Sequence, residues 1–325
     1  MKRREFIVLG GAAGLLATTG ISLAQDNWPS KPVTVISAYP PGGTSDILAR
    51  LVADILTKEL GQQFVLENVA GAAGALAGGQ LARSAPDGYT MLVSGSAPIA
   101  ANKVVQANLA YDPEADFEPI TVFAQSAAIL TASPKAPAKT LPELIAYAKS
   151  NPGQVNIGNP GAGTKGHICA ALIGQLAGVE INHVPYKGSP PLAAGLLGGH
   201  IDYSLDAPAN YLAHIRSGAL LALAVTSAER MGELPDVPTV AEQGFDGYEQ
   251  TLWFGVVGPK GMPAEIVGKI NDTLKTWSQA PESQQLLVSL GVAPVLNTPE
   301  EMRQTMSREI EAIRPLVEAG LVQPS

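Results

Sequence analysis

Residues Val155 to Lys187 read V-N-I-G-N-P-G-A-G-T-K-G-H-I-C-A-A-L-I-G-Q-L-A-G-V-E-I-N-H-V-P-Y-K, and this stretch decides the fold. A β-type run over 155–158 breaks into a turn rich in glycine and proline. The turn leads into a helix predicted over 165–177, which Gly178 ends, and a second apolar run follows. Such a unit makes its two strands parallel neighbours. It also places the first turn of its helix at the carboxyl end of the sheet, where ligands of open α/β sheets bind.

The turn before this helix is a predicted anion site. Glycine lets the backbone approach a ligand, and the N–H groups of a helix's first turn carry partial positive charge. The spacing Gly161-x-Gly163-x-x-Gly166 also matches a dinucleotide fingerprint. That fingerprint needs an acidic residue at the end of the next strand, whereas Glu180 precedes the strand. Nucleotide binding is therefore not expected, and a purely structural turn stays open as the alternative.

A second glycine-containing turn follows a predicted strand over 33–39. Gly42 and Gly43 precede an amphipathic helix, for which Thr44 or Ser45 is the expected N-cap. Asp46 falls in the first turn, where the helix dipole favours a carboxylate. Two roles for Asp46 stay open, stabilising the helix or ordering a ligand.

The rest of the chain alternates strands and helices. The order over 155–226 is βαβαβαβ, with a helix expected over 208–217, and this order predicts a largely parallel sheet. About 300 mature residues favour two domains. The composition changes near 125–140 and again near 250–263. These changes predict two crossings between the domains, with the C-terminal helices returning to the first.

The first 24 residues have the features of a signal peptide. Lys2, Arg3 and Arg4 precede a short apolar run, and Ser22-Leu23-Ala24 fits a cleavage site. The twin arginine is compatible with Tat export and the whole segment with Sec export, and both routes lead to the periplasm. No later apolar stretch is long enough to span a bilayer.

The charge balance excludes some partners. The whole chain has a formal net charge of −8, and removing the +2 of residues 1–24 leaves −10. This acidity argues against nucleic-acid binding and gives no general attraction for acidic ligands, so local geometry must bind any anion. The single cysteine, Cys169, is expected to be a buried, inert thiol.

Motifs for catalysis and metal binding are missing from the sequence. The four histidines have no partners at metal-ligand spacing, and the chain contains no P-loop, no G-x-S-x-G elbow and no nucleophile beside a base. His167 lies in a helix's first turn, as either a structural histidine or a ligand contact. No metal, no cofactor and no enzyme activity are therefore predicted.

Six segments in order resemble the Bug-type extracytoplasmic solute receptors of tripartite tricarboxylate transporters, along essentially the whole mature length. The segments are Tyr39-Pro-Pro-Gly-Gly43 with Asp46 and Ala49-Arg50, Pro86-Asp-Gly-Tyr-Thr90, Gly161-Ala-Gly-Thr164 with His167, Val184-Pro-Tyr-Lys-Gly188, Leu223-Ala-Val-Thr226 with Arg230, and Pro235-Asp-Val-Pro-Thr-Val-Ala-Glu242. The family usually has Asn-Arg-Pro-Gly where this chain has Asn68-Val-Ala-Gly71, so no contact is carried over from that loop.

The resemblance implies an α/β, two-lobed periplasmic binding protein of the type II-like kind. Each lobe is a mostly parallel sheet flanked by helices, and two crossing strands join the lobes. Residues 1–24 are then the signal peptide, 25–127 with 255–325 form lobe 1, and 128–254 form lobe 2. The ligand-binding residues implied are Tyr39, Gly42, Gly43, Thr44, Asp46, Ser96, Gly161, Ala162, Gly163, Thr164, His167, Tyr186, Lys187 and Asp206.

The resemblance also implies partners: a small organic carboxylate, bound as the lobes close, and the membrane subunits of the transporter. A monomer is expected. Presentation of the ligand to a sensor kinase, or an enzyme acting on a carboxylic acid, are the alternatives. The kind of acid stays open between aliphatic di- or tricarboxylates, amino acids and aromatic acids. Lys165, beside the second turn, is either solvated or paired with a second ligand carboxylate.

Overall fold

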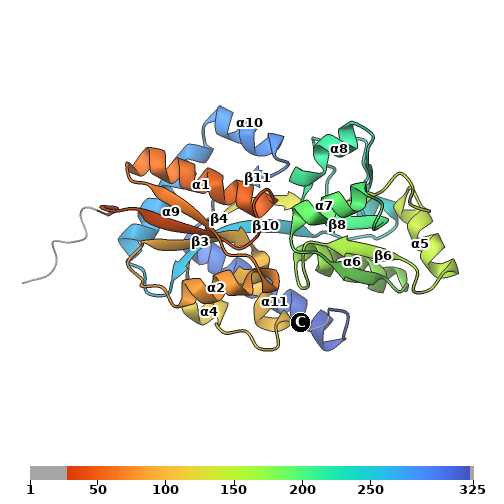
Figure 1. Ribbon diagram of the computed structural model, residues 1–325, viewed down its shortest axis with the longest axis horizontal. Helices are drawn as coiled ribbons and strands as arrows, with labels where there is room; N and C mark the ends of the chain where they lie inside the picture. The colour runs from red at the N-terminus through yellow and green to blue at the C-terminus, as the bar shows by residue number, and fades with distance from the viewer. Residues whose placement is uncertain (1–27, 323–325) are drawn as a thin grey trace, which may run out of the picture.

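The computed structural model describes residues 28–322, and the expected signal peptide lies outside this range. The described chain forms two lobes, one around a six-stranded sheet and the other around a five-stranded sheet, side by side in Figure 1. Both sheets are flanked by helices, so the expected two-lobed α/β architecture is confirmed. No helix of residues 28–322 is long and apolar enough to cross a membrane.

Lobe 1 contains the six-stranded sheet, in the order β11-β4-β10-β3-β1-β2. Strands β1, β2 and β3 are parallel, and β10 and β11 run against β3 and β4. Helices α1 and α9 lie on one face of the sheet, and α2 and α11 on the other (Figure 1). The strands are β1 Val33–Ser37, β2 Phe64–Asn68, β3 Thr90–Gly95, β4 Phe117–Ala127, β10 Thr251–Pro259 and β11 Ala293–Pro294. The helices are α1 Thr44–Leu60, α2 Ala75–Ala82, α3 Asn102–Val105, α4 Pro113–Asp116, α9 Ala264–Ser278, α10 Pro281–Ser289 and α11 Pro299–Glu318.

Lobe 2 contains the five-stranded sheet, in the order β7-β6-β8-β5-β9. Its strands are β5 Ile129–Ala132, β6 Asn156–Asn159, β7 Asn182–Pro185, β8 Tyr203–Asp206 and β9 Leu221–Val225. Its helices are α5 Leu141–Ser150, α6 Lys165–Ala177, α7 Ser189–Leu197 and α8 Leu212–Arg216. Because β5 alone opposes its neighbours β8 and β9, the strands over 155–226 share one direction, as predicted.

The helix predicted after the glycine-rich turn is found at the expected residues. It covers 165–177, and Gly178 ends it in the left-handed conformation. The expected helix over 208–217 is wrong as a single element. Tyr211 leaves helical geometry, with φ −120° and ψ −31°, and separates the short turn Pro208–Asn210 from α8. The Tyr211 hydroxyl instead donates to Asp206 Oδ2 at 3.3 Å.

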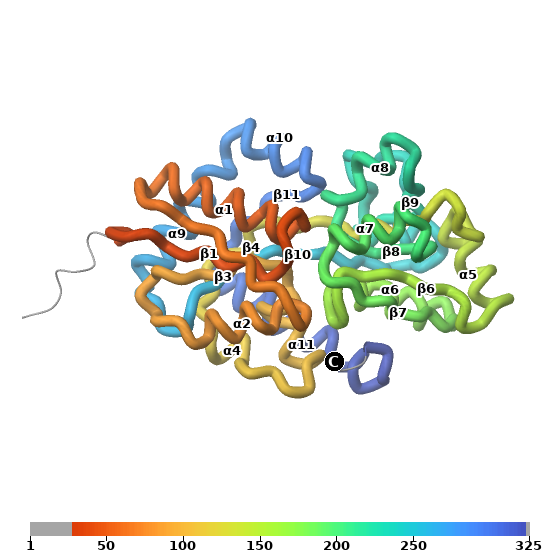
Figure 2. The backbone as a smooth tube through the Cα atoms, viewed as in Figure 1, coloured from red at the N-terminus to blue at the C-terminus, as the bar shows by residue number. Residues whose placement is uncertain are grey.

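Two chain crossings join the lobes, through β4 into β5 and from β9 back into β10 (Figure 2). Thr226, which is fully buried, ties the two crossings together. Its hydroxyl accepts from the Ala128 N–H at 2.8 Å and donates to the Gln250 carbonyl at 2.7 Å. Strand β10 pairs with β4 from Thr251 onward, ahead of the predicted boundary at residue 255. The exact division of the chain into lobes stays a prediction.

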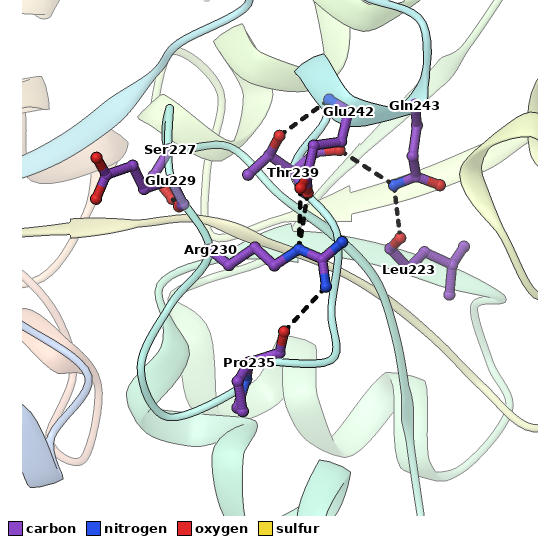
Figure 3. Close-up of polar contacts among 8 residues, drawn as sticks. All are labelled: Leu223, Ser227, Glu229, Arg230, Pro235, Thr239, Glu242 and Gln243. Carbon is purple, nitrogen blue, oxygen red and sulfur yellow. Dashed lines mark hydrogen bonds and ion pairs between the residues drawn. The ribbon is translucent and has the colours of Figure 1, made fainter.

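The segment 226–250, which includes Arg230 and the resembling segment 235–242, has a structural role in lobe 2. Arg230 Nε lies 2.9 Å from Glu242 Oε2, and the Thr239 N–H donates to the same oxygen at 2.7 Å (Figure 3). The Glu242 N–H donates in turn to Thr239 Oγ1 at 3.0 Å, which is the reciprocal pattern of a capping box. Gln243 Nε2 then reaches the Leu223 carbonyl in β9. These contacts hold the long connection against the sheet.

Candidate functional site

The interlobe cleft contains a cavity of about 60 Å³. Its walls come from both lobes: the first turns of α1 and α6, the residues after β3, the end of β8, and the crossing strand β10. Helix N-termini hold N–H groups without partners inside the helix, together with the positive end of the helix dipole. Two such ends meet at this cavity.

The first turn of α1 is held in place by hydrogen bonds to its neighbours. Gly43 is the N-cap residue, and no side chain caps the helix, so the expected caps at Thr44 and Ser45 are wrong. Both residues already belong to the helix. Ser45 Oγ accepts from the Gly95 N–H at 3.1 Å and so ties α1 to β3. Thr44 lines the cavity, and its hydroxyl is buried and has no hydrogen-bond partner within residues 28–322.

Asp46 holds this turn in place by hydrogen bonds made outside the cavity. Its carboxylate accepts from the Gly42 N–H at 2.9 Å, from Asn68 Nδ2 at 2.7 Å, and from Arg50 through two nitrogens. Burial disfavours the ionised form, but the hydrogen bonds from Arg50, Asn68 and Gly42 outweigh it and hold the pKa of Asp46 below its ordinary value. Asp46 does not line the cavity. It therefore fixes the loop that presents α1.

The glycines before α6 direct their N–H groups to the protein itself. The Gly161 N–H donates to Asn159 Oδ1 at 3.1 Å, and the Gly163 N–H donates to His167 Nδ1 at 2.9 Å. The residues that reach the cavity are Thr164, Lys165 and Gly166. The surface available to an anion is thus the first helical turn, and the glycine run shapes the approach to it.

His167 is a neutral, structural histidine. Burial lowers its pKa to about 4, and its ring packs on His183 with the centroids 4.4 Å apart. Since Nδ1 accepts from Gly163, the ring proton is on Nε2. His167 lines a recess on the outer side of α6 and not the interlobe cavity. No group of three potential metal ligands occurs in the part of the chain that the structure describes.

Asp206 is the one carboxylate in the cavity wall of the described chain. It lies at the end of β8, is 3% exposed, and accepts from the Ala207 N–H at 2.7 Å and from the Tyr211 hydroxyl. Burial raises the pKa of Asp206 to about 6, against the smaller opposing effect of hydrogen bonds from Ser189, Ala207 and Tyr211. The buried carboxylate is therefore about half protonated near pH 6 and mostly ionised at pH 7.

Replacing Asp206 by Asn should change how stability depends on pH. The folded-state pKa of about 6 exceeds the ordinary value of 3.8, so the folded state binds more protons between these values. The stabilisation from protonation is complete below pH 3.8 and is lost as the pH rises through 6. The loss is about 3 kcal/mol, because each pKa unit corresponds to 1.36 kcal/mol. Urea unfolding at several pH values should show wild type losing stability relative to Asp206→Asn over this range. Parallel curves would contradict the assignment.

Lys165 is neither solvated nor available to solvent anions. Its side chain is 11% exposed, and Nζ lies 3.1 and 3.0 Å from the two carboxylate oxygens of Glu309 on α11. Ser96 Oγ also donates to Glu309 Oε1, at 3.2 Å. A buried ion pair thus crosses between the lobes at the edge of the cavity.

The structure brings six of the fourteen expected site residues to the cavity wall: Tyr39, Gly43, Thr44, Ser96, Thr164 and Asp206. Gly161, Ala162, Tyr186 and Lys187 line a neighbouring crevice between the lobes, and the others lie behind the turns. The cavity wall also includes Ser45, Ser189 and the β10 residues Leu252, Trp253 and Phe254, which were not among the fourteen. The one sequence signal that β10 would line the cavity was its predicted position as a strand that crosses between the two lobes.

Thr44 and Trp253, two residues of the cavity wall, each have a buried polar group without a partner in the described chain. Trp253 Nε1 is buried without a partner in the described chain, as is the Thr44 hydroxyl. Buried donors in native proteins are normally satisfied, and leaving one unpaired is costly. The two helix N-termini at the cavity suit an anion with several acceptor atoms, such as a carboxylate.

This chain is similar to a known protein family and to several solved structures. The profile of the tripartite tricarboxylate transporter family receptor matches residues 48–321. Rpa4515 of Rhodopseudomonas palustris, solved with adipate, is 33% identical and covers 92% of this chain and 100% of its own, with a TM-score of 0.88. The periplasmic binding protein BugD is 31% identical over 91% and 99%, with a TM-score of 0.85. MatC of R. palustris, with bound malate, is 31% identical over 89% and 100%, with a TM-score of 0.84.

Proposed function

Because this chain belongs to the tripartite tricarboxylate transporter receptor family, whose members are Bug-type periplasmic solute-binding proteins, we propose that it captures a small organic carboxylate by lobe closure. It acts in the periplasm, after export by the segment 1–24, and delivers its ligand to the membrane subunits of a transporter of this family. It binds its ligand as a monomer and without chemical conversion.

The observation that carries this proposal is the meeting of two helix N-termini, α1 of lobe 1 and α6 of lobe 2, at one cavity. A carboxylate has two oxygens and several lone pairs, so both ends can bind it at once. Each lobe then contributes about half of the donors. The site is complete only when the lobes are together, which couples ligand binding to closure.

Contacts between the lobes support a closed arrangement. Asn210 Nδ2 of lobe 2 donates to the Gly42 carbonyl of lobe 1 at 3.0 Å. Val105 of α3 also packs with Ile168 and Ala171 of α6. These contacts lie between the same two lobes that supply the cavity wall. The crossings at Ala128 and Gln250 are the positions at which the lobes would pivot.

A thermal-shift screen of the mature protein tests the proposal. The ligands are aliphatic mono-, di- and tricarboxylates, amino acids and aromatic acids, with the matching alcohols and amides as controls. A ligand at about a hundred times its dissociation constant adds about 2.7 kcal/mol to the free energy of unfolding, which raises the melting temperature. We expect a shift with one class of acid, none with its uncharged analogue, and no product after long incubation. Equal shifts with the uncharged analogues, or turnover, would contradict a carboxylate receptor.

A further inference from the structure

The Lys165–Glu309 pair decides the charge of the cavity. Lys165 is the only lysine or arginine among the lining residues of the described chain. Both Glu309 oxygens contact its ammonium group, and the two side chains are 11% and 8% exposed. Ser96 holds Glu309 from the cavity side through its hydroxyl. The positive charge of Lys165 is therefore already neutralised within the protein.

The remaining wall has no unpaired basic side chain for a second anionic group among the described residues. Asp206 is the other charged group, and its carboxylate repels a second carboxylate. Arg50 is outside the cavity and paired with Asp46, and Lys187 faces the neighbouring crevice. The two helix N-termini can satisfy one carboxylate.

Much of the cavity wall is apolar. β10 contributes Leu252, Trp253 and Phe254, and Pro40 of lobe 1 and Pro160 of lobe 2 also line the cavity. The whole cavity, with the space for the carboxylate included, has a volume of about 60 Å³, which gives room for about four to six water-sized groups, so a longer acid fits only if the lobes close less fully. A compact apolar body fits such a space better than a chain that ends in a second charged group.

We propose that this cavity selects a monocarboxylate with a compact apolar body, and that Glu309 sets this selectivity by keeping Lys165 from the ligand. The inference rests on the proposed receptor function. A dicarboxylate would have to take Lys165 from Glu309, and a buried Glu309 carboxylate would then keep only the Ser96 hydroxyl. The ligand adipate of Rpa4515 has two carboxylates, so the selectivity proposed here differs from that ligand.

Calorimetric titration with matched acids tests the proposal. Hexanoate and adipate, butyrate and succinate, and benzoate and terephthalate each differ by one carboxylate. We expect wild type to bind the monocarboxylates that fit the cavity at least about 100-fold more tightly than the matched dicarboxylates. The reason is that a dicarboxylate would leave a buried charge unpaired, which is costly. In Glu309→Gln, Lys165 is released, and the ratio should move at least about tenfold toward the dicarboxylate.

Two further variants keep the test decisive. In Lys165→Met/Glu309→Leu both charges are removed, so the preference for monocarboxylates should remain even if Glu309→Gln fails to fold. Glu242→Gln breaks the Arg230 pair elsewhere in lobe 2 and should leave the ratio unchanged.

The outcomes separate the two proposals. If no acid of either kind binds, the receptor function fails, and the selectivity fails with it. If the dicarboxylates bind wild type as tightly as their partners, the receptor function stands and the selectivity is wrong. A ratio unaffected by Glu309→Gln would overturn the role of Glu309. Tighter binding of norleucine than of hexanoate would contradict the proposal that the ligand has an apolar body.

Discussion

Replacing Gly43 by Leu should weaken carboxylate binding at least about 100-fold, because the new side chain enters the place where the two lobes meet. Gly43 has an extended backbone, with φ −82° and ψ 165°, so a larger residue is tolerated by the chain itself. A Cβ at this position lies 3.6 Å from Pro190 Cδ and 3.7 Å from Ser189 Cβ, both in lobe 2. A leucine side chain extends beyond Cβ and would hold the lobes apart.

The measurement is calorimetric titration with the acid that the screen identifies, together with the melting temperature. Gly268→Leu is the matched control, because nothing lies within 4 Å of its Cβ position on α9. We expect both variants to fold and only Gly43→Leu to lose binding. Wild-type affinity in Gly43→Leu would show that closure at this point is not needed. Gly163 is less suitable, since its φ is +78° and its Cβ would lie 2.5 Å from Val105 Cγ1.

Replacing Thr226 by Val should lower the free energy of unfolding by about 2–5 kcal/mol. Val has nearly the same shape, but the Ala128 N–H and the Gln250 carbonyl lose their partner at a buried position. Each unpaired buried group costs about 1–3 kcal/mol. The effect falls on the two crossings, so the connection between the lobes should loosen as well.

Urea unfolding followed by tryptophan fluorescence measures this loss. Thr131→Val in β5 is the control, because its hydroxyl is equally buried and has no partner within residues 28–322. Removing an unpaired hydroxyl should be neutral or stabilising. Equal destabilisation of the two variants would show that the Thr226 bonds contribute nothing.

Local signals in the sequence predicted the elements well. Gly178 and the turn before Lys165 mark both ends of α6, and the alternation over 155–226 predicted the direction of its strands. The first crossing, predicted from the composition change near 125–140, is found where β4 passes into β5 at Ala128. Errors occur where a tertiary contact overrides a local preference. Tyr211 breaks a helix and bonds Asp206, and Ser45 bonds β3 instead of capping α1.

The site could be predicted only in outline. The two turns were found because glycine before a helix is visible in the sequence. The direction of each N–H group was not visible, since it depends on Asn159 and His167 as acceptors. The ion pair joins residues 165 and 309, and no local pattern connects positions so far apart. Trp253 enters the cavity because β10 crosses between the lobes, which is a property of the assembled fold.

The most direct test is a crystal structure of the mature protein with the tightest-binding acid of the screen. We expect one carboxylate at hydrogen-bonding distance from the first-turn N–H groups of both α1 and α6, with the Thr44 hydroxyl or Trp253 Nε1 as a further donor. A ligand bound to one lobe only, or in the recess beside His167 and His183, would contradict the account.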